Sequence, residues 1–260
     1  MNKDLSTPAP LPVFRIIGDA IQFVWDKKFR MFQALLIPAA ALFILKFTTP
    51  LTHSISSDPG FSGHALWGWL SFLIQTALYG LFAITCHRLA LIGDHSVPDY
   101  GLKIWTPRES RYLGWFFAVL IIWMLFSFVV NSFYVSIIIS DVEAGASVES
   151  FESTRRGLNL MYVPLLYILC RLSVLYPAIA VDQPVTAQWA WRFTAHNGLR
   201  LTIIVGILPG VLYFLMSFLS RDTATFAESA ILTLIGFILM AVEIVALSFS
   251  YKHLAETEVS

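Results

Sequence analysis

Two charged side chains lie inside stretches that are otherwise apolar: Arg171 in "ILCRLSVLYPAIA" and Glu243 in "FILMAVEIVALSF". A charged side chain in the middle of a bilayer costs about 3 kcal/mol or more, so each of these residues needs a partner. A guanidinium beside a carboxylate could bind an anionic substrate or carry protons, or it could simply clamp two helices together. We favour the clamp, because buried ion pairs often fix geometry without taking part in chemistry.

The predicted pairing of Arg171 with Glu243 rests on their depth in the bilayer. Measured from the cytoplasmic ends of the predicted spans, the two positions differ by about two residues, or about 3 Å along a helix. An arginine side chain is long enough to cover that distance. We therefore expect an intramembrane ion pair that joins the fourth and sixth spans.

Other polar residues and two prolines also interrupt the apolar stretches. Ser132 and Ser136 lie one helical turn apart, with Asn131 beside them. Such a stripe usually bonds to a neighbouring helix or to its own carbonyls, although it could line a polar path. Pro177 and Pro209 predict a break or kink in the fourth and fifth spans, because proline has no N–H to donate.

The chain carries no motif for catalysis or for metal binding. It has no nucleophile elbow, phosphate loop, HExxH or EF-hand pattern. Cys86 and Cys170 lie in apolar runs, where thiols pack as small hydrophobic groups. The net charge is zero, which gives no reason to expect a nucleic-acid partner. We expect no metal, no cofactor and no enzymatic activity.

The composition is that of a membrane protein. Hydrophobic residues make up 57% of the 260 residues and charged residues only 13%, against about 25% charged residues in soluble domains. A helix needs about 20 apolar residues to cross a bilayer, and six stretches qualify: approximately 31–48, 65–86, 112–139, 161–181, 199–219 and 230–251. The sequence predicts an all-α membrane protein with six transmembrane helices in one domain spanning 1–260.

The distribution of lysine and arginine predicts the orientation, because cytoplasmic loops are enriched in these residues. One side of the predicted topology carries Lys3, Arg15, Lys27, Lys28, Arg30, Arg88, Lys103, Arg108, Arg111, Arg192, Arg200 and Lys252. The other side carries only Arg155, Arg156 and Arg221. We expect both termini in the cytoplasm, with residues 1–12 as a polar tail.

A proline recurs at a fixed spacing. Pro12, Pro98 and Pro184 are 86 residues apart, and each opens a segment that contains tryptophan and leads through an arginine into a span. The three segments, 13–30, 98–111 and 185–198, are predicted to lie in the cytoplasmic membrane interface. The predicted interfacial anchors are Trp25, Trp105, Trp189 and Trp191. The chain would then be three tandem units of an interfacial helix and a helical hairpin.

The first of these segments has the clearest helical pattern. Its polar residues step by 4, 3 and 4 and so form one narrow stripe: Arg15, Asp19, Gln22 and Asp26. Its large apolar residues occupy another face: Phe14, Ile17, Ile21, Val24 and Trp25. The middle segment is weaker, because Pro107 is expected to interrupt a helix there.

One stretch resembles a known group of proteins. The stretch "CRLSVLYPAIAVDQPVTAQWAWRFTAHNGLRL" combines an arginine in the fourth span, a "PAIAVD" exit and an amphipathic "WRFT" segment. It is similar to bacterial six-span inner-membrane proteins of the YciC type and to the membrane domains of glycerophosphodiester phosphodiesterases. The resemblance implies a six-span fold in the bacterial inner membrane. It does not carry over the phosphodiesterase activity, because no such catalytic domain is present.

Two functions are compatible with these features. The first is a non-enzymatic membrane protein with an envelope-organising or scaffolding role. The alternative is a small transporter or lipid-handling protein with a polar site around Arg171 and Glu243. The expected partners are membrane lipids, with further copies of the chain or other envelope proteins as additional candidates. A polar cavity that reaches Arg171 would favour transport, and a solid core there would favour a scaffold.

Overall fold

The computed structural model describes residues 10–55, 63–101, 105–143, 157–219 and 225–259, and these residues form helices and no strand. Six helical stretches are long and apolar enough to cross a membrane: 28–48, 66–91, 107–139, 157–180, 198–219 and 226–257. The all-α, six-span prediction is therefore confirmed. The predicted ends differ from the observed ones by less than two helical turns.

The first half of the chain builds three long helices after a short one. Helix α1 (Val13–Asp26) turns at Lys27 into α2 (Lys28–Ile55), and α3 (Gly63–Leu91) returns beside α2. Two short 3-10 turns, η1 (Asp94–Ser96) and η2 (Asp99–Gly101), precede α4 (Pro107–Glu143).

The expectation that Pro107 interrupts a helix is wrong, because Pro107 is the first residue of α4. Proline is well tolerated at that position, where its missing N–H would have had no helical partner. Thr106 and Glu109 complete the start: the Glu109 carboxylate accepts hydrogen bonds from both the backbone N–H and the hydroxyl of Thr106. This is half of a capping box, the arrangement that fixes where many helices begin.

The fourth span is broken into α6 (Tyr162–Leu172) and α7 (Leu175–Ala180). Pro177 has no N–H for the carbonyl of Ser173, and that carbonyl accepts instead from Tyr176, three residues on, at 3.0 Å. The chain therefore tightens just before the proline. It leaves the span beyond Ala180 toward α8 (Ala187–Phe193).

The fifth span contains a π-helical turn. It consists of α9 (Gly198–Thr202), η3 (Ile203–Ile207) and α10 (Leu208–Leu219). In η3 the N–H of Leu208 donates to the carbonyl of Ile203, five residues earlier. Pro209 follows directly, and a widened turn is one of the recognised ways in which a helix accommodates an irregularity of this kind.

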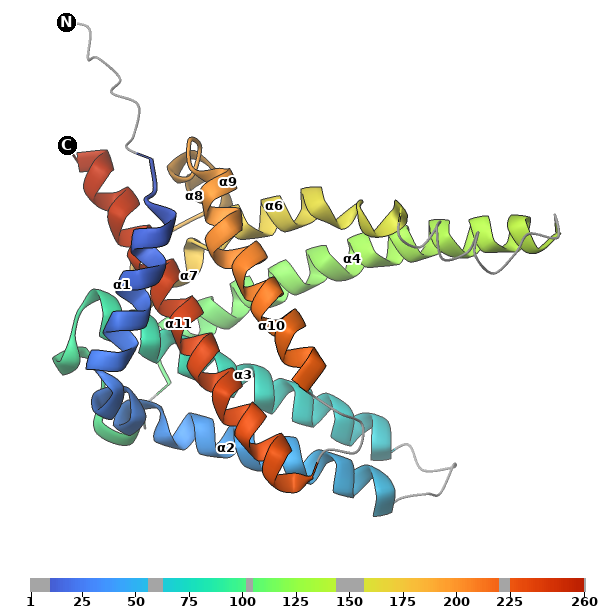
Figure 1. Ribbon diagram of the computed structural model, residues 1–260, viewed down its shortest axis with the longest axis horizontal. Coiled ribbons are helices and arrows are strands. Elements are labelled where there is room, and N and C mark those ends of the chain that lie inside the picture. Colours follow the sequence, from blue (N-terminus) through green and yellow to red (C-terminus); the bar gives the residue numbers. More distant parts are fainter. Residues whose placement is uncertain (1–9, 56–62, 102–104, 144–156, 220–224, 260) are drawn as a thin grey trace, which may run out of the picture.

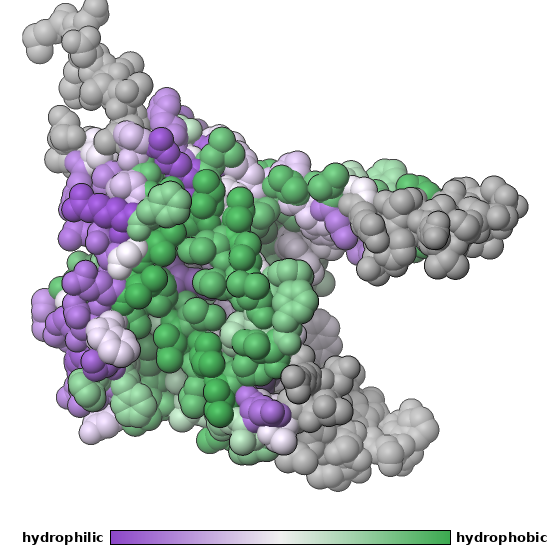
Figure 2. Space-filling model, in the orientation of Figure 1, coloured by the Kyte–Doolittle hydropathy of each residue, from purple (hydrophilic) through white to green (hydrophobic). Residues whose placement is uncertain are grey.

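Helix α11 (Phe226–Val259) closes the fold by packing along α3 and then along α1. The start of α1 and the end of α11 lie at the same end of the molecule as the α3–α4 connection and α8 (Figure 1). Figure 2 shows hydrophilic residues gathered at that end and apolar residues over the surface of the spans.

The apolar core lies at this end of the molecule as well. Its fully buried members include Phe82 and Leu89 on α3, Leu175 and Ile179 on α7, and Val245 on α11. The spans are thus tied together near the termini, and α7 is wrapped by α3, α4 and α11.

Candidate functional site

The hydrogen-bond partners of Arg171 lie on the segment that follows its own span. Its side chain is 5% exposed, and its Nε donates to the Thr194 hydroxyl at 2.9 Å. A terminal guanidinium nitrogen donates to the carbonyl of Trp191, and the guanidinium carbon lies 3.6 Å from the centre of the Trp191 ring. Hydrogen bonds and a cation–π contact together compensate for the burial of the charge.

The local sequence explains why Trp191 and Thr194 reach Arg171. Thr186 caps α8 through its hydroxyl, which accepts from the N–H of Trp189 at 3.2 Å. Thr194 ends the helix and donates its own hydroxyl proton to the carbonyl of Ala190 at 2.8 Å. The lone pairs of that hydroxyl are then free to accept from Arg171.

Close backbone approach is needed on the same side. A Cβ atom at Gly198 would lie 2.6 Å from the Tyr167 hydroxyl and 3.0 Å from Cδ of Arg171. A Cβ atom at Gly206 would lie 2.8 Å from the Cys170 sulfur. The fifth span therefore approaches α6 through two glycines, where no larger residue fits without a shift.

The predicted ion pair between Arg171 and Glu243 is not formed. Both residues are described, and Arg171 donates to Thr194 and Trp191 instead. Oε1 of Glu243 is buried and has no hydrogen-bond partner. The prediction compared depths along the helix axes, and similar depth does not make two helices neighbours that face each other.

A second charged cluster surrounds Asp182. One of its carboxylate oxygens accepts from Arg88 at 3.2 Å and from Arg108 at 3.0 Å, and Arg111 lies 3.9 Å from the other. Arg108 is 5% exposed and also donates to Glu109, with the shorter of two bonds at 2.7 Å. The cluster joins the end of α3 and the start of α4 to the residues that follow α7.

The backbone at Asp182 explains its position. Asp182 has φ of 65° and follows α7, and the N–H of Gln183 donates to the carbonyl of Ala178 at 3.0 Å. This is the Schellman arrangement that ends many helices, usually with glycine at the left-handed position. Aspartate tolerates that conformation better than most residues. Arg88 also binds the carbonyl of Ala180 at 2.9 Å, which closes the last turn of α7.

The comparisons return nothing. No protein-family model, curated protein or solved structure matches this chain. Among the described residues there is also no group of three or more histidine, cysteine, aspartate or glutamate side chains that could hold a metal ion. The chemistry of the chain has to be argued from its own side chains.

The polar stripe of the third span bonds to its own helix. Asn131 donates to the carbonyl of Ser127 at 2.8 Å, Ser132 to that of Phe128 at 2.8 Å, and Ser136 to that of Ser132 at 3.0 Å. These contacts match hydrogen bonding to the helix's own carbonyls better than the lining of a polar path. Asn131 is itself exposed on α4.

The four predicted anchor tryptophans have different surroundings. Trp25 is 69% exposed and lies 4.3 Å from the Lys28 ammonium, and Trp105 donates to the Ser110 hydroxyl at 2.9 Å. Trp189 instead stacks on Phe193, with 4.6 Å between the ring centres, and Trp191 covers Arg171. Their depth in a membrane stays a prediction.

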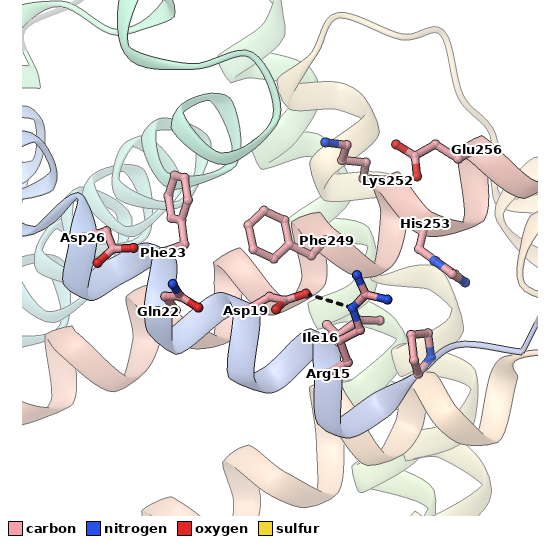
Figure 3. Close-up of a pocket in the computed structure, with 11 residues that line it drawn as sticks. Arg15, Ile16, Asp19, Gln22, Phe23, Asp26, Phe249, Lys252, His253 and Glu256 are labelled. Atoms are coloured by element: carbon pink, nitrogen blue, oxygen red, sulfur yellow. Dashed lines mark ion pairs between the residues drawn. The ribbon is translucent and has the colours of Figure 1, made fainter.

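A pocket of about 590 Å³ lies between α1 and the end of α11. Its lining includes the whole polar stripe of the first amphipathic segment together with Lys252, His253 and Glu256 of α11. Figure 3 shows His253 extending from α11 toward the side where Arg15 lies on α1. Sequence reasoning identified the stripe and placed its segment in the membrane interface, but it gave the stripe no partner within the chain. Lys252, His253 and Glu256 sit at helical spacing on one face of the last helix, and that spacing was the available signal.

Proposed function

We propose that this chain is a non-enzymatic protein of the bacterial inner membrane, with both termini in the cytoplasm, that acts as a scaffold for other membrane proteins. The resemblance to six-span proteins of the YciC type belongs to the same proposal. The basic residues among those described support the orientation, because they gather at the end of the molecule that holds the termini. Arg155, Arg156 and Arg221, which the sequence places on the opposite side, lie outside the described residues.

The single observation that carries the scaffold proposal is the exposure of α4. Only 6% of an apolar 18-residue stretch of its span is buried inside the protein, compared with 61% of the corresponding stretch of the fourth span. Ile121, Ile122, Trp123, Met124 and Leu125 are all exposed. Five consecutive residues cover every side of an α-helix, so the described residues bury no face of this part of α4.

Its length strengthens the inference. The 37 residues of α4 span about 55 Å at helical rise, whereas the hydrocarbon core is about 30 Å thick. Phe128 is 72% exposed in the distal part of the helix, where Asn131 is exposed as well. A polar amide at a membrane helix surface favours association with another helix that can share its hydrogen bonds.

The buried charges support a structural role over a transport site. Arg171 and Arg108 are each held by partners within the chain, and the large pocket is lined by neither of them. The alternative of a polar transport site around Arg171 and Glu243 depended on their proximity. That observation is lost, because the two side chains do not pair.

Contacts between consecutive units support the proposed threefold repeat. Arg30 of the first unit donates to the carbonyl of Val97, just before Pro98, at 2.7 Å. Arg111 of the second unit lies near Asp182, two residues before Pro184.

The third unit returns to the first in the same way. Its Asn197 accepts from the N–H of Leu11, just before Pro12, at 2.8 Å. Each unit thus holds the start of the next, and the third holds the start of the first.

Crosslinking in native membranes tests the scaffold. We would place a cysteine at Phe128 on α4 and, as a matched control, at Phe214, which is also exposed but lies on α10. The proposal expects Phe128→Cys to give a crosslinked protein product, which Asn131→Leu weakens, and Phe214→Cys to give none. The mass of the product distinguishes a second copy from another protein. Equal products from both positions, or none from Phe128→Cys, would reject the scaffold.

A reporter assay tests the orientation separately. C-terminal fusions to a cytoplasmic reporter are expected to be active, and fusions to an exported reporter inactive. The opposite result would place the termini outside the cytoplasm.

A further inference from the structure

The pocket between α1 and α11 is built from one face of each helix. Arg15, Asp19, Gln22 and Asp26 step along α1, and Phe249, Lys252, His253 and Glu256 step along α11. The two helices are far apart in the sequence, and neither could form the pocket alone. A cavity of about 590 Å³ is within the range of small-ligand sites.

The charges around this pocket are of both signs. Arg15 and Asp19 form an exposed ion pair at 3.7 Å, a kind of pair that contributes little to stability and can be replaced at small cost. Lys252, Asp26 and Glu256 make no ion pair with any described residue. A ligand carrying both a negative and a positive group would satisfy more of these side chains than a simple ion.

One histidine ring nitrogen in the pocket lacks a hydrogen-bond partner. Nε2 of His253 is buried and has no hydrogen-bond partner within the protein. It lies on the same face of α11 as Lys252, one residue away. Together with Arg15 these groups make a cationic and hydrogen-bonding end that suits a phosphate.

The surroundings of the pocket are apolar on one side. Phe14 is 91% exposed, and Ile21 and Trp25 are exposed along the same stripe of α1. That stripe lies about 100° around the helix from the polar stripe, which is one residue step. An exposed apolar stripe beside a charged one is the arrangement of helices that lie in the membrane interface.

We propose that this pocket binds the headgroup of a zwitterionic phospholipid with a primary amine, of the phosphatidylethanolamine type. The phosphate lies by Arg15, Lys252 and His253, and the ammonium donates to Asp19 and to the amide oxygen of Gln22, which lie one helical turn apart on α1. The acyl chains run along the stripe of Phe14, Ile21 and Trp25.

Other ligands fit the pocket less well. Three carboxylates against two permanent cations disfavour a purely anionic headgroup. A metal ion is disfavoured because the described acidic and histidine side chains do not converge on one point. A quaternary amine has no N–H to donate to the carboxylates. The site does not depend on the scaffold role, because it lies on α1 and α11 and not on α4.

The test measures lipid binding by the full chain, purified in detergent and freed of lipid, using native mass spectrometry. The added lipids are phosphatidylethanolamine, phosphatidylcholine and phosphatidylglycerol with identical acyl chains. Arg15→Gln and Asp19→Asn each remove one end of the site, and both residues are exposed, so the fold is retained. Arg192→Gln is the matched control, since Arg192 is exposed on α8 and outside the pocket.

We expect phosphatidylethanolamine to bind most tightly, and each pocket variant to weaken it about tenfold, as loss of a charge-assisted hydrogen bond predicts. Arg192→Gln should bind it like the wild type. Equal affinity for the three lipids, or an equal loss in Arg192→Gln, overturns the site. Equal binding of phosphatidylcholine alone overturns the primary amine. Displacement of the lipid by soluble glycerophosphoethanolamine at equal concentration overturns the assignment to a lipid.

Discussion

Arg171 should be energetically coupled to Thr194 and not to Glu243. The perturbations are Arg171→Met, Thr194→Val and Glu243→Gln, singly and in pairs. Valine keeps the shape of Thr194, which is fully buried, and removes only the hydroxyl that accepts from Arg171 at 2.9 Å. A hydrogen bond to a charged group contributes about 1.5–3 kcal/mol, so the Arg171–Thr194 coupling energy should fall in that range.

The pair with Glu243 serves as the comparison. Because the guanidinium donates to Thr194 and Trp191, Arg171→Met and Glu243→Gln should add within about 0.5 kcal/mol. The assay is reversible unfolding of the purified protein in mixed micelles by a denaturing detergent, followed by tryptophan fluorescence. A coupling above about 1 kcal/mol between Arg171 and Glu243, or none between Arg171 and Thr194, would refute this account of the site.

Three further predictions concern packing and the buried polar contacts. Gly198→Ala should destabilise the protein, because its Cβ would lie 2.6 Å from the Tyr167 hydroxyl. As the control, a Cβ at Gly236 meets nothing within 4 Å, so Gly236→Ala should be neutral or stabilising by up to about 1 kcal/mol. The measurement is the free energy of unfolding of the two variants, and equal effects would contradict the close approach. Asp182→Ala should lower the free energy of unfolding by about 1.5–3 kcal/mol, because it removes the charge-assisted hydrogen bonds from Arg88 and Arg108 while Arg108 keeps its bonds to Glu109. A loss below about 1 kcal/mol would mean that the cluster is only a surface feature. Ser248→Ala should cost about 1–3 kcal/mol, because Nδ1 of the buried His87 loses its 2.8 Å contact; thermal unfolding against Ser217→Ala, whose exposed hydroxyl bonds only to its own helix, is the check, and equal midpoints would count against it.

The spans were predictable because each needs only a sufficient apolar length, which is a local property of the chain. Even the long third span was visible, and α4 is indeed the longest helix described. The ends shifted where caps act: Thr106 and Glu109 start α4 before the apolar run begins. Pro107 was misjudged because proline breaks a helix interior but suits its first turn.

The charge at Arg171 was also visible, but its partner was not. The nearest candidate by sequence logic was an opposite charge at the same depth. The actual partners are a neutral hydroxyl, a backbone carbonyl and an aromatic ring on a segment expected to lie outside the protein, in the interface. Which residues reach Arg171 depends on how the chain turns after Asp182. That turn was hard to predict, because its left-handed position is occupied by aspartate and not by the glycine that usually marks it.

The hydrogen bond between Leu11 and Asn197 spans 186 positions of the sequence, and α1 packs mainly on α11, which is synthesised long after it. The binding surface of α1 therefore does not exist while the first five spans are being synthesised and inserted. During that interval α1 can lie at the membrane surface, because its exposed apolar stripe of Phe14, Ile21 and Trp25 is stable in contact with lipid. Helix α1 thus leaves the ribosome well before its packing partner α11, and contact with lipid shields its apolar stripe until α11 is in place.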